Sequence, residues 1–120
     1  MIDMAKNLNS RRTEKLLKEL ELYKSSLDYF SKIRGCSEIP VSQYRSIHSK
    51  IKFLTHTIAA VEHATTLLGA TEYDVISKLY FNKDMTFDDV CESCALERSS
   101  IYRYRASALK KMSIALFGAE

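Results

Sequence analysis

Residues 86–112 read TFDDVCESCALERSSIYRYRASALKKM, and the order of polar and apolar residues in this stretch decides the fold. Thr86 is followed three residues later by Asp89, which is the pattern of a capping box and predicts a helix from about Phe87 to Ser93. A short turn at Ala95-Leu96 then separates this helix from a longer one over about residues 97–117. A short helix, a tight turn and a longer helix are the layout of a helix-turn-helix.

The segment that precedes this stretch completes a three-helix domain. A helix from Glu72 to about Phe81 is expected, capped by Thr71 with Asp74 and turned inward through three residues, Tyr73, Ile76 and Tyr80. The following short helix is expected to bury Phe87, Val90 and Cys91. The last helix is expected to bury Ile101, Ala108, Leu109, Met112 and Leu116.

The first part of the chain has the pattern of a helical hairpin. A helix is expected from about Ser10 to Arg34, then a break at residues 35–40 (GCSEIP), then a helix from Val41 to Leu68 with Gly69 as its C-cap. Apolar residues recur at steps of three and four in both helices, which is a heptad, coiled-coil-like seam. The expected seam is Leu16, Leu20, Tyr23, Leu27 and Phe30, widened by Leu17 and Ile33, against Tyr44, Ile47, Ile51, Leu54, Ile58, Val61 and Leu68.

These patterns predict an all-α chain with two parts. We expect residues 1–69 to form an antiparallel helical hairpin for dimerisation or partner docking, and residues 70–120 to form a three-helix helix-turn-helix domain of the kind used for DNA binding. One Pro and three Gly in 120 residues favour long helices. Because each seam spans only about three heptads, the hairpin must pack against the C-terminal domain or a second copy of the chain.

Positive charge is concentrated on the last helix. Residues 97–111 carry five Lys/Arg and one Asp/Glu, whereas residues 71–96 carry two and six. With Ile101 at the centre of the buried face, Ser99, Arg103, Ala106 and Lys110 lie opposite it. Arginine and hydroxyl groups suit base edges and phosphates, and small residues allow close approach.

The expected roles follow from position on the helix. Base contacts are expected from Ser99, Ser100 and Arg103, and Tyr102 suits a thymine methyl or a phosphate. Lysines at the far end suit phosphates, and the amides at the start of the Thr86 helix suit another phosphate. Arg105 lies near the buried side. The predicted DNA-binding residues are Thr86, Arg98, Ser99, Ser100, Tyr102, Arg103, Lys110 and Lys111.

The last fifty residues resemble the DNA-binding fourth conserved region of bacterial sigma factors, and are similar to phage transcription regulators of the ArpU and RinA type. The shared elements are Tyr80-Phe81, Thr86 with two acids after it, Arg98–Arg103 and Ala108–Lys111. The resemblance implies a helix-turn-helix fold and an accessory transcription regulator. Because the resemblance does not extend to the promoter-melting part of a sigma factor, we do not expect a complete initiation factor.

Three positions depart from the pattern of this family. Ala95 stands where Gly is usual at the turn, which predicts a different or strained backbone. Glu97 replaces the usual Ser or Thr cap of the recognition helix. Cys94 stands where Leu is common and makes a smaller core.

Other site chemistry has weaker support. Cys91 and Cys94 are read as buried thiols, because no second Cys pair or suitably spaced His completes a zinc site. His56 and His63 share a face but are two turns apart, too far for one ion. We expect no metal, no cofactor and no enzymatic activity. An N-terminus without an apolar core, and no apolar run near ~18 residues, predict a cytoplasmic protein with no membrane partner.

The leading hypothesis is a sequence-specific, double-stranded DNA-binding transcription regulator of phage or mobile-element type. Its expected partners are duplex DNA, a second copy in a homodimer, and RNA polymerase. Two alternatives remain open: an adaptor that contacts RNA polymerase or another regulator without reading DNA sequence, and a helical assembly protein whose basic helix is only solvated.

Overall fold

The computed structural model describes residues 4–36 and 38–119, and within these ranges it contains helices and no strands. The prediction of an all-α chain is therefore confirmed. The elements are α1 (Met4–Arg34), α2 (Val41–Thr66), α3 (Ala70–Ile76), a π-helical segment η1 (Ser77–Phe81), α4 (Phe87–Cys94) and α5 (Arg98–Phe117). Helix α1 begins six residues before the expected start at Ser10.

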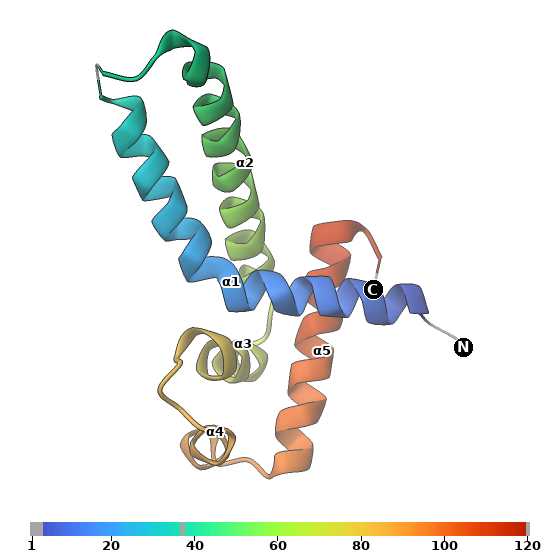
Figure 1. Ribbon diagram of the computed structural model, residues 1–120. Coiled ribbons are helices and arrows are strands. Elements are labelled where there is room, and N and C mark those ends of the chain that lie inside the picture. Colours follow the sequence, from blue (N-terminus) through green and yellow to red (C-terminus); the bar gives the residue numbers. More distant parts are fainter. Residues whose placement is uncertain (1–3, 37, 120) are drawn as a thin grey trace.

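The C-terminal half of α1 pairs with α2 to form the predicted hairpin (Figure 1). The amide of Gly35 closes α1 by donating to the carbonyl oxygens of Ser31 (3.3 Å) and Lys32 (3.2 Å). Most of the α2 seam is buried as predicted, and Ala64 joins it. Tyr44 was wrongly placed in this seam: it is 44% exposed, and its hydroxyl donates to the carbonyl of Arg34 at the open end of the hairpin.

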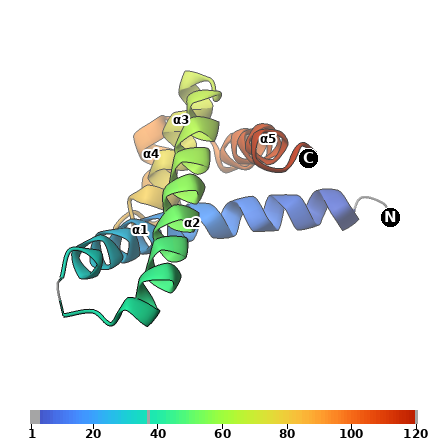
Figure 2. The same cartoon turned by 90° about the horizontal axis from the view of Figure 1, so that it is seen from above.

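The N-terminal half of α1 crosses α5, so the hairpin and the C-terminal helices share one core (Figures 1 and 2). Leu17 and Met112 are almost completely buried in it, and each contributes about 1.5–3 kcal/mol by this burial. At the crossing, the hydroxyls of Thr13 and Ser113 form a buried hydrogen bond of 2.8 Å. The C-terminal helices are therefore what the hairpin packs against.

The start of α3 differs from the sequence-based expectation. Gly69 caps the N-terminus of α3 instead of the C-terminus of α2, where Leu67 is the cap residue. The carboxylate of Glu72 accepts the Gly69 amide at 2.9 Å, so the expected pairing of Thr71 with Asp74 is wrong. The Glu72 side chain is buried, and a buried carboxylate needs hydrogen-bond donors, one of which is the Gly69 amide.

The inward face of α3 also needs one correction. Ile76 and Tyr80 are buried as predicted, but Tyr73 is 46% exposed and the fully buried Val75 takes its place. The regular helix expected as far as Phe81 widens into η1, where the amide of Asn82 bonds to the carbonyl of Ser77, five residues back, at 3.1 Å. This wider turn lets three consecutive residues, 79–81, contact the core.

The turn between α4 and α5 is built as the sequence predicts and carries strain at Ala95. The capping box is present, with Asp89 N donating to Thr86 Oγ1 (3.1 Å) and Thr86 N donating to Asp89 Oδ2 (3.0 Å). Helix α4 ends in Ala95, the one non-glycine residue with positive φ among those described (φ 56°, ψ 42°). A Cβ atom in this left-handed region costs about 1–2 kcal/mol.

We predict that Ala95→Gly stabilises the protein. Relief of the strained Cβ exceeds the entropy that glycine adds to the unfolded chain, so the free energy of unfolding rises by about 0.5–1 kcal/mol. Urea denaturation followed by circular dichroism measures this change. The matched control is Ala59→Gly on the exposed face of α2, which costs about 0.5–1 kcal/mol. Destabilisation by both substitutions to the same extent would contradict strain at Ala95.

Candidate nucleic-acid interface

Helix α4 and the N-terminal half of α5 form the end of the molecule that lies away from the hairpin (Figure 1). A small second core of Val75, Val90 and Ile101 holds α3, α4 and α5 together there. Helix α1 crosses α5 near Ser113, and Ser99, Tyr102 and Arg103 in the first turns of α5 are exposed. This is the spatial arrangement that a helix-turn-helix requires.

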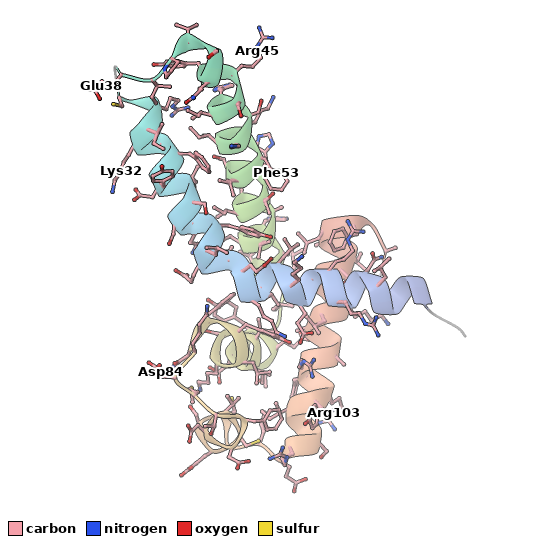
Figure 3. The ribbon with its side chains drawn as sticks, viewed as in Figure 1. Lys32, Glu38, Arg45, Phe53, Asp84 and Arg103 are labelled. Carbon is pink, nitrogen blue, oxygen red and sulfur yellow. The ribbon has the colours of Figure 1, made fainter. Side chains whose placement is uncertain are left out.

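The outer face of α5 consists of the residues that lie opposite the fully buried Ile101. Ser99, Tyr102, Arg103, Ala106 and Lys110 are exposed, and Ser100 is half-buried. Figure 3 shows Arg103 on the side of α5 turned away from α4. Its guanidinium lies 5.5 Å from the centre of the Tyr104 ring, and the Arg103 side chain is exposed. Helical periodicity therefore placed this face correctly.

Arg98 and Tyr102 both contact the first turn of α4. The Arg98 guanidinium lies 4.6 Å from the centre of the Phe87 ring and donates to Asp88 Oδ1 at 2.7 Å. The Tyr102 ring packs against the same Phe87 ring, with 5.0 Å between centroids. An ion pair this exposed adds little stability, but it fixes where the guanidinium sits. The sequence predicted Phe87 as a core residue and missed this surface cluster.

Lys111 points to a different place from the one the sequence suggested. Its Nζ donates to Glu72 Oε1 at 2.8 Å, and Ser107 Oγ donates to Glu72 Oε2. Together with the Gly69 amide, these groups join α3 to α5. The charge of Lys111 is therefore already compensated within the protein, whereas the sequence suggested a phosphate contact.

The Glu72 carboxylate stays ionised because its hydrogen bonds outweigh its burial. Burial alone raises its pKa, and the hydrogen bonds from Lys111, Ser107 and the Gly69 amide lower it, with a net pKa below the ordinary value. Thr86 has a similar structural role, since its hydroxyl and amide both belong to the capping box of α4.

Arg105 lies behind the outer face and joins three elements. Its Nε donates to Tyr80 Oη at 2.9 Å and its Nη2 donates to Glu14 Oε2 at 2.8 Å, while Tyr80 Oη donates to the same oxygen at 2.6 Å. Burial and the Glu14 acceptor raise the pKa of Tyr80, so the phenol remains a donor. Helical counting placed Arg105 near the buried side, and its partner Glu14 carried no signal in the sequence.

Carboxylates surround the cations at this end of the molecule. Asp88, Asp89, Glu92 and Glu97 are exposed on α4 and in the turn. Glu97 is the N-cap residue of α5 and its side chain forms no capping hydrogen bond, as expected for Glu at this position. This end of the molecule therefore carries exposed charges of both signs.

Comparisons with models of protein families, with curated proteins and with solved structures found no match to this chain. The likeness to sigma-factor and phage-regulator domains therefore stands on the residues alone. Among the described residues, no cluster of three His, Cys, Asp or Glu side chains is placed to hold a metal ion, and no helix has the length and hydrophobicity to cross a membrane. Cys36, Cys91 and Cys94 are free thiols, and Cys94 donates to Asp74.

We predict that Glu72 makes stability depend on pH. Because its pKa is lower in the folded state than the ordinary value of 4.5, its contribution is present above that pH and is lost as pH falls through the folded-state value. At pH ~7, Glu72→Gln should cost about 1–2 kcal/mol, and this difference should shrink towards pH ~3.

Urea denaturation at several pH values measures this change. Glu62→Gln is the control, because Glu62 forms an exposed ion pair with Lys24 at 3.2 Å and should change stability little at any pH. If Glu72→Gln lowered the free energy of unfolding equally at every pH, the negative charge of Glu72 would make no contribution to stability. The pKa of Glu14 is also lowered, so the stability of both variants should still fall to some extent in acid.

Proposed function

We propose that this chain is a sequence-specific DNA-binding transcription regulator whose α5 enters the major groove of duplex DNA. The observation that carries this proposal is the division of the cations on α5. Arg105 and Lys111 are paired with buried or half-buried carboxylates of the protein, whereas Arg103 stands on the outer face at the accessible end. An α-helix with a basic, small-residue face suits the width of the major groove.

The residues of the outer face divide by chemistry. Arg103 can donate two parallel hydrogen bonds to a guanine, and Ser99 and Ser100 are small enough to let the helix approach base edges. Arg98, held against Phe87, and Lys110 suit phosphates on either side of the groove. Base contacts would then specify the site and phosphate contacts would fix the register.

The resemblance to sigma-factor region four and to ArpU- and RinA-type regulators supports a role in transcription. On this resemblance we expect such a protein to act in a bacterial cytoplasm, on phage or mobile-element DNA, with RNA polymerase as a further partner. If two copies bind together, their recognition helices meet half-sites about 34 Å apart. The length and symmetry of the preferred DNA site distinguish one bound copy from two.

The mixed charge of this end favours a second candidate function. Asp88 pairs with Arg98, and Glu92 and Glu97 are exposed on α4 and in the turn. Such a surface suits a protein partner with charges of both signs. The alternative is an adaptor that contacts RNA polymerase or another regulator. Such an adaptor would bind different duplexes weakly and equally.

The deciding experiment is selection of binding sites from a random duplex pool. The selected duplex and a scrambled control are then compared by fluorescence anisotropy over a salt series. We expect a preference of ~10³ or more for the selected site. Two phosphate-contacting cations, Arg98 and Lys110, would make log affinity fall with log salt at a slope of about −2 for each bound copy. No enrichment, with equal weak binding to both duplexes, would favour the adaptor.

We predict that Arg103→Ala weakens binding to the selected site by about 1–3 kcal/mol and reduces discrimination against the scrambled duplex. Lys110→Ala is the matched substitution for a phosphate contact, and it should weaken both duplexes equally. Lys32→Ala, on the hairpin, should change neither. If Arg103→Ala weakened both duplexes to the same degree, Arg103 would be a phosphate contact and base reading would have to lie elsewhere.

A further inference from the structure

The side of the hairpin nearest the end of α5 is hollowed along its length. Two adjoining hollows, of about 410 Å³ and about 460 Å³, share Tyr23 and Phe53 as common walls. We call them together the hairpin groove. Its apolar lining includes Leu16, Leu22, Tyr23, Phe30, Phe53 and Leu116.

The apolar lining of the groove is exposed to an unusual degree. Phe53 is 64% exposed and Leu22 is 61% exposed, although both are large apolar side chains. Figure 3 shows Phe53 projecting outward from α2. No part of the described chain covers these side chains. A contiguous apolar surface of this kind, bordered by polar residues, is typical of a protein-interaction site.

The charges on the lining of the groove are all positive. Arg12 and Lys15 line one hollow and Lys50 lines the other, and no carboxylate lines either. The Arg12 guanidinium lies 4.3 Å from the centre of the Phe117 ring, and Lys50 Nζ lies 5.2 Å from that of Phe30. Cations therefore lie towards both ends of the hairpin groove.

The acidic residues of the hairpin are engaged elsewhere. Glu62 pairs with Lys24 at 3.2 Å beside a separate hollow, and Asp28 pairs with Lys32 at 3.0 Å. Glu19 accepts the hydroxyl of Tyr23, which lines the groove, at 3.1 Å. Among the residues that line the groove, the occupant thus meets three cations and no carboxylate.

We propose that the hairpin groove binds an amphipathic α-helix of a partner protein whose apolar face is flanked by Asp and Glu. The α2 residues that line the groove run from Ser49 to Val61, which at 1.5 Å per residue is about 18 Å, or three helical turns. A partner helix of that length presents apolar anchors at positions i, i+4 and i+7, with Phe53 between two of them. Acidic residues beside the anchors would face Arg12, Lys15 and Lys50.

The same charges disfavour a second copy of this chain as the occupant. A twofold-symmetric pair of hairpins brings the same surface of both copies together. The three cations of one groove would then face those of the other, and the like charges would repel. An acidic helix satisfies both the apolar strip and the cations.

This partner site is connected to α5. Leu116 and Phe117, in the last turn of α5, form one end of the groove, and Ser113 and Met112 anchor the preceding turn to α1. A bound helix would therefore contact the helix that also carries Arg103. The inference about the groove nevertheless stands on the hairpin and does not depend on DNA binding.

The test is a selection against the full chain, without DNA, from a displayed library of 20-residue helical peptides. Three anchor positions vary among Leu, Ile, Met and Phe, and the flanking positions vary among Glu, Lys, Gln and Ala. We expect enriched peptides to carry an excess of Glu at the flanks. Their affinity, measured by anisotropy, should fall at least tenfold for Phe53→Ala and for the double substitution Lys15→Glu with Lys50→Glu.

The controls separate binding from folding and from self-association. Val41→Ala removes an apolar side chain that is 85% exposed and outside the groove, and it should leave peptide affinity unchanged. Circular dichroism checks that each variant is folded. The proposal is overturned if no peptide is enriched over a Phe53→Ala counter-target, or if the winners carry no excess of Glu. It is also overturned if sedimentation shows a dimer that Phe53→Ala abolishes, because a second copy would then occupy the groove.

Discussion

The burial of α1 by two different partners is the constraint on which the rest of the structure depends. Its C-terminal half is covered by α2, and its N-terminal half is covered by α5 through Leu17, Met112 and the Thr13–Ser113 hydrogen bond. Neither a two-helix hairpin nor a three-helix domain of this size buries much apolar surface alone. The shared core solves this problem for both, and it fixes the direction of α5 relative to the hairpin.

Fixing α5 in this way also decides which of its cations are available to a ligand. Arg105 is drawn to Glu14 of α1 and to Tyr80, and Lys111 is drawn to Glu72 of α3. The half-buried Glu14 and the buried Glu72 can remain charged because several donors surround each carboxylate. The side of α5 that faces the protein is thereby neutralised, and Arg103 lies on the outer face, away from these carboxylates. A count of Lys and Arg along α5 does not reveal this division.

Local patterns in the sequence were enough for the parts of the fold that depend on neighbours in the chain. The capping box at Thr86 and the inward position of Ile101 follow from residues within one or two turns, and both are present. The predicted cap of α3 was wrong because Thr71 with Asp74 has the same three-residue spacing to an acid as the observed pair, Gly69 with Glu72. Which acid caps the helix is decided by the burial of Glu72 and by its bond to Lys111, which is 39 residues away in the sequence.

The contacts that sequence patterns could not reach are those between distant elements. Glu14 and Arg105 are 91 residues apart, and neither stands in a motif that points to the other. The widened turn at η1 was missed for a related reason. It exists because residues 79–81 all meet the core, which is a property of the assembled helices and not of the local sequence. The outer face of α5 was predictable because it needs only helical periodicity and one buried reference residue.

The attachment of α4 would couple folding to the proposed DNA binding at this end of the molecule. Helix α4 has eight residues and one fully buried side chain, Val90, and it leads into the strained Ala95. Much of its remaining contact with α5 is made by the Phe87 ring against Arg98 and Tyr102. These two residues therefore hold the helices together with the same groups that they would offer to a phosphate. The ring contact of Arg103 is with Tyr104 of α5 and not with α4. A change in DNA affinity caused by substitution of Arg103 can therefore be read as a change in recognition.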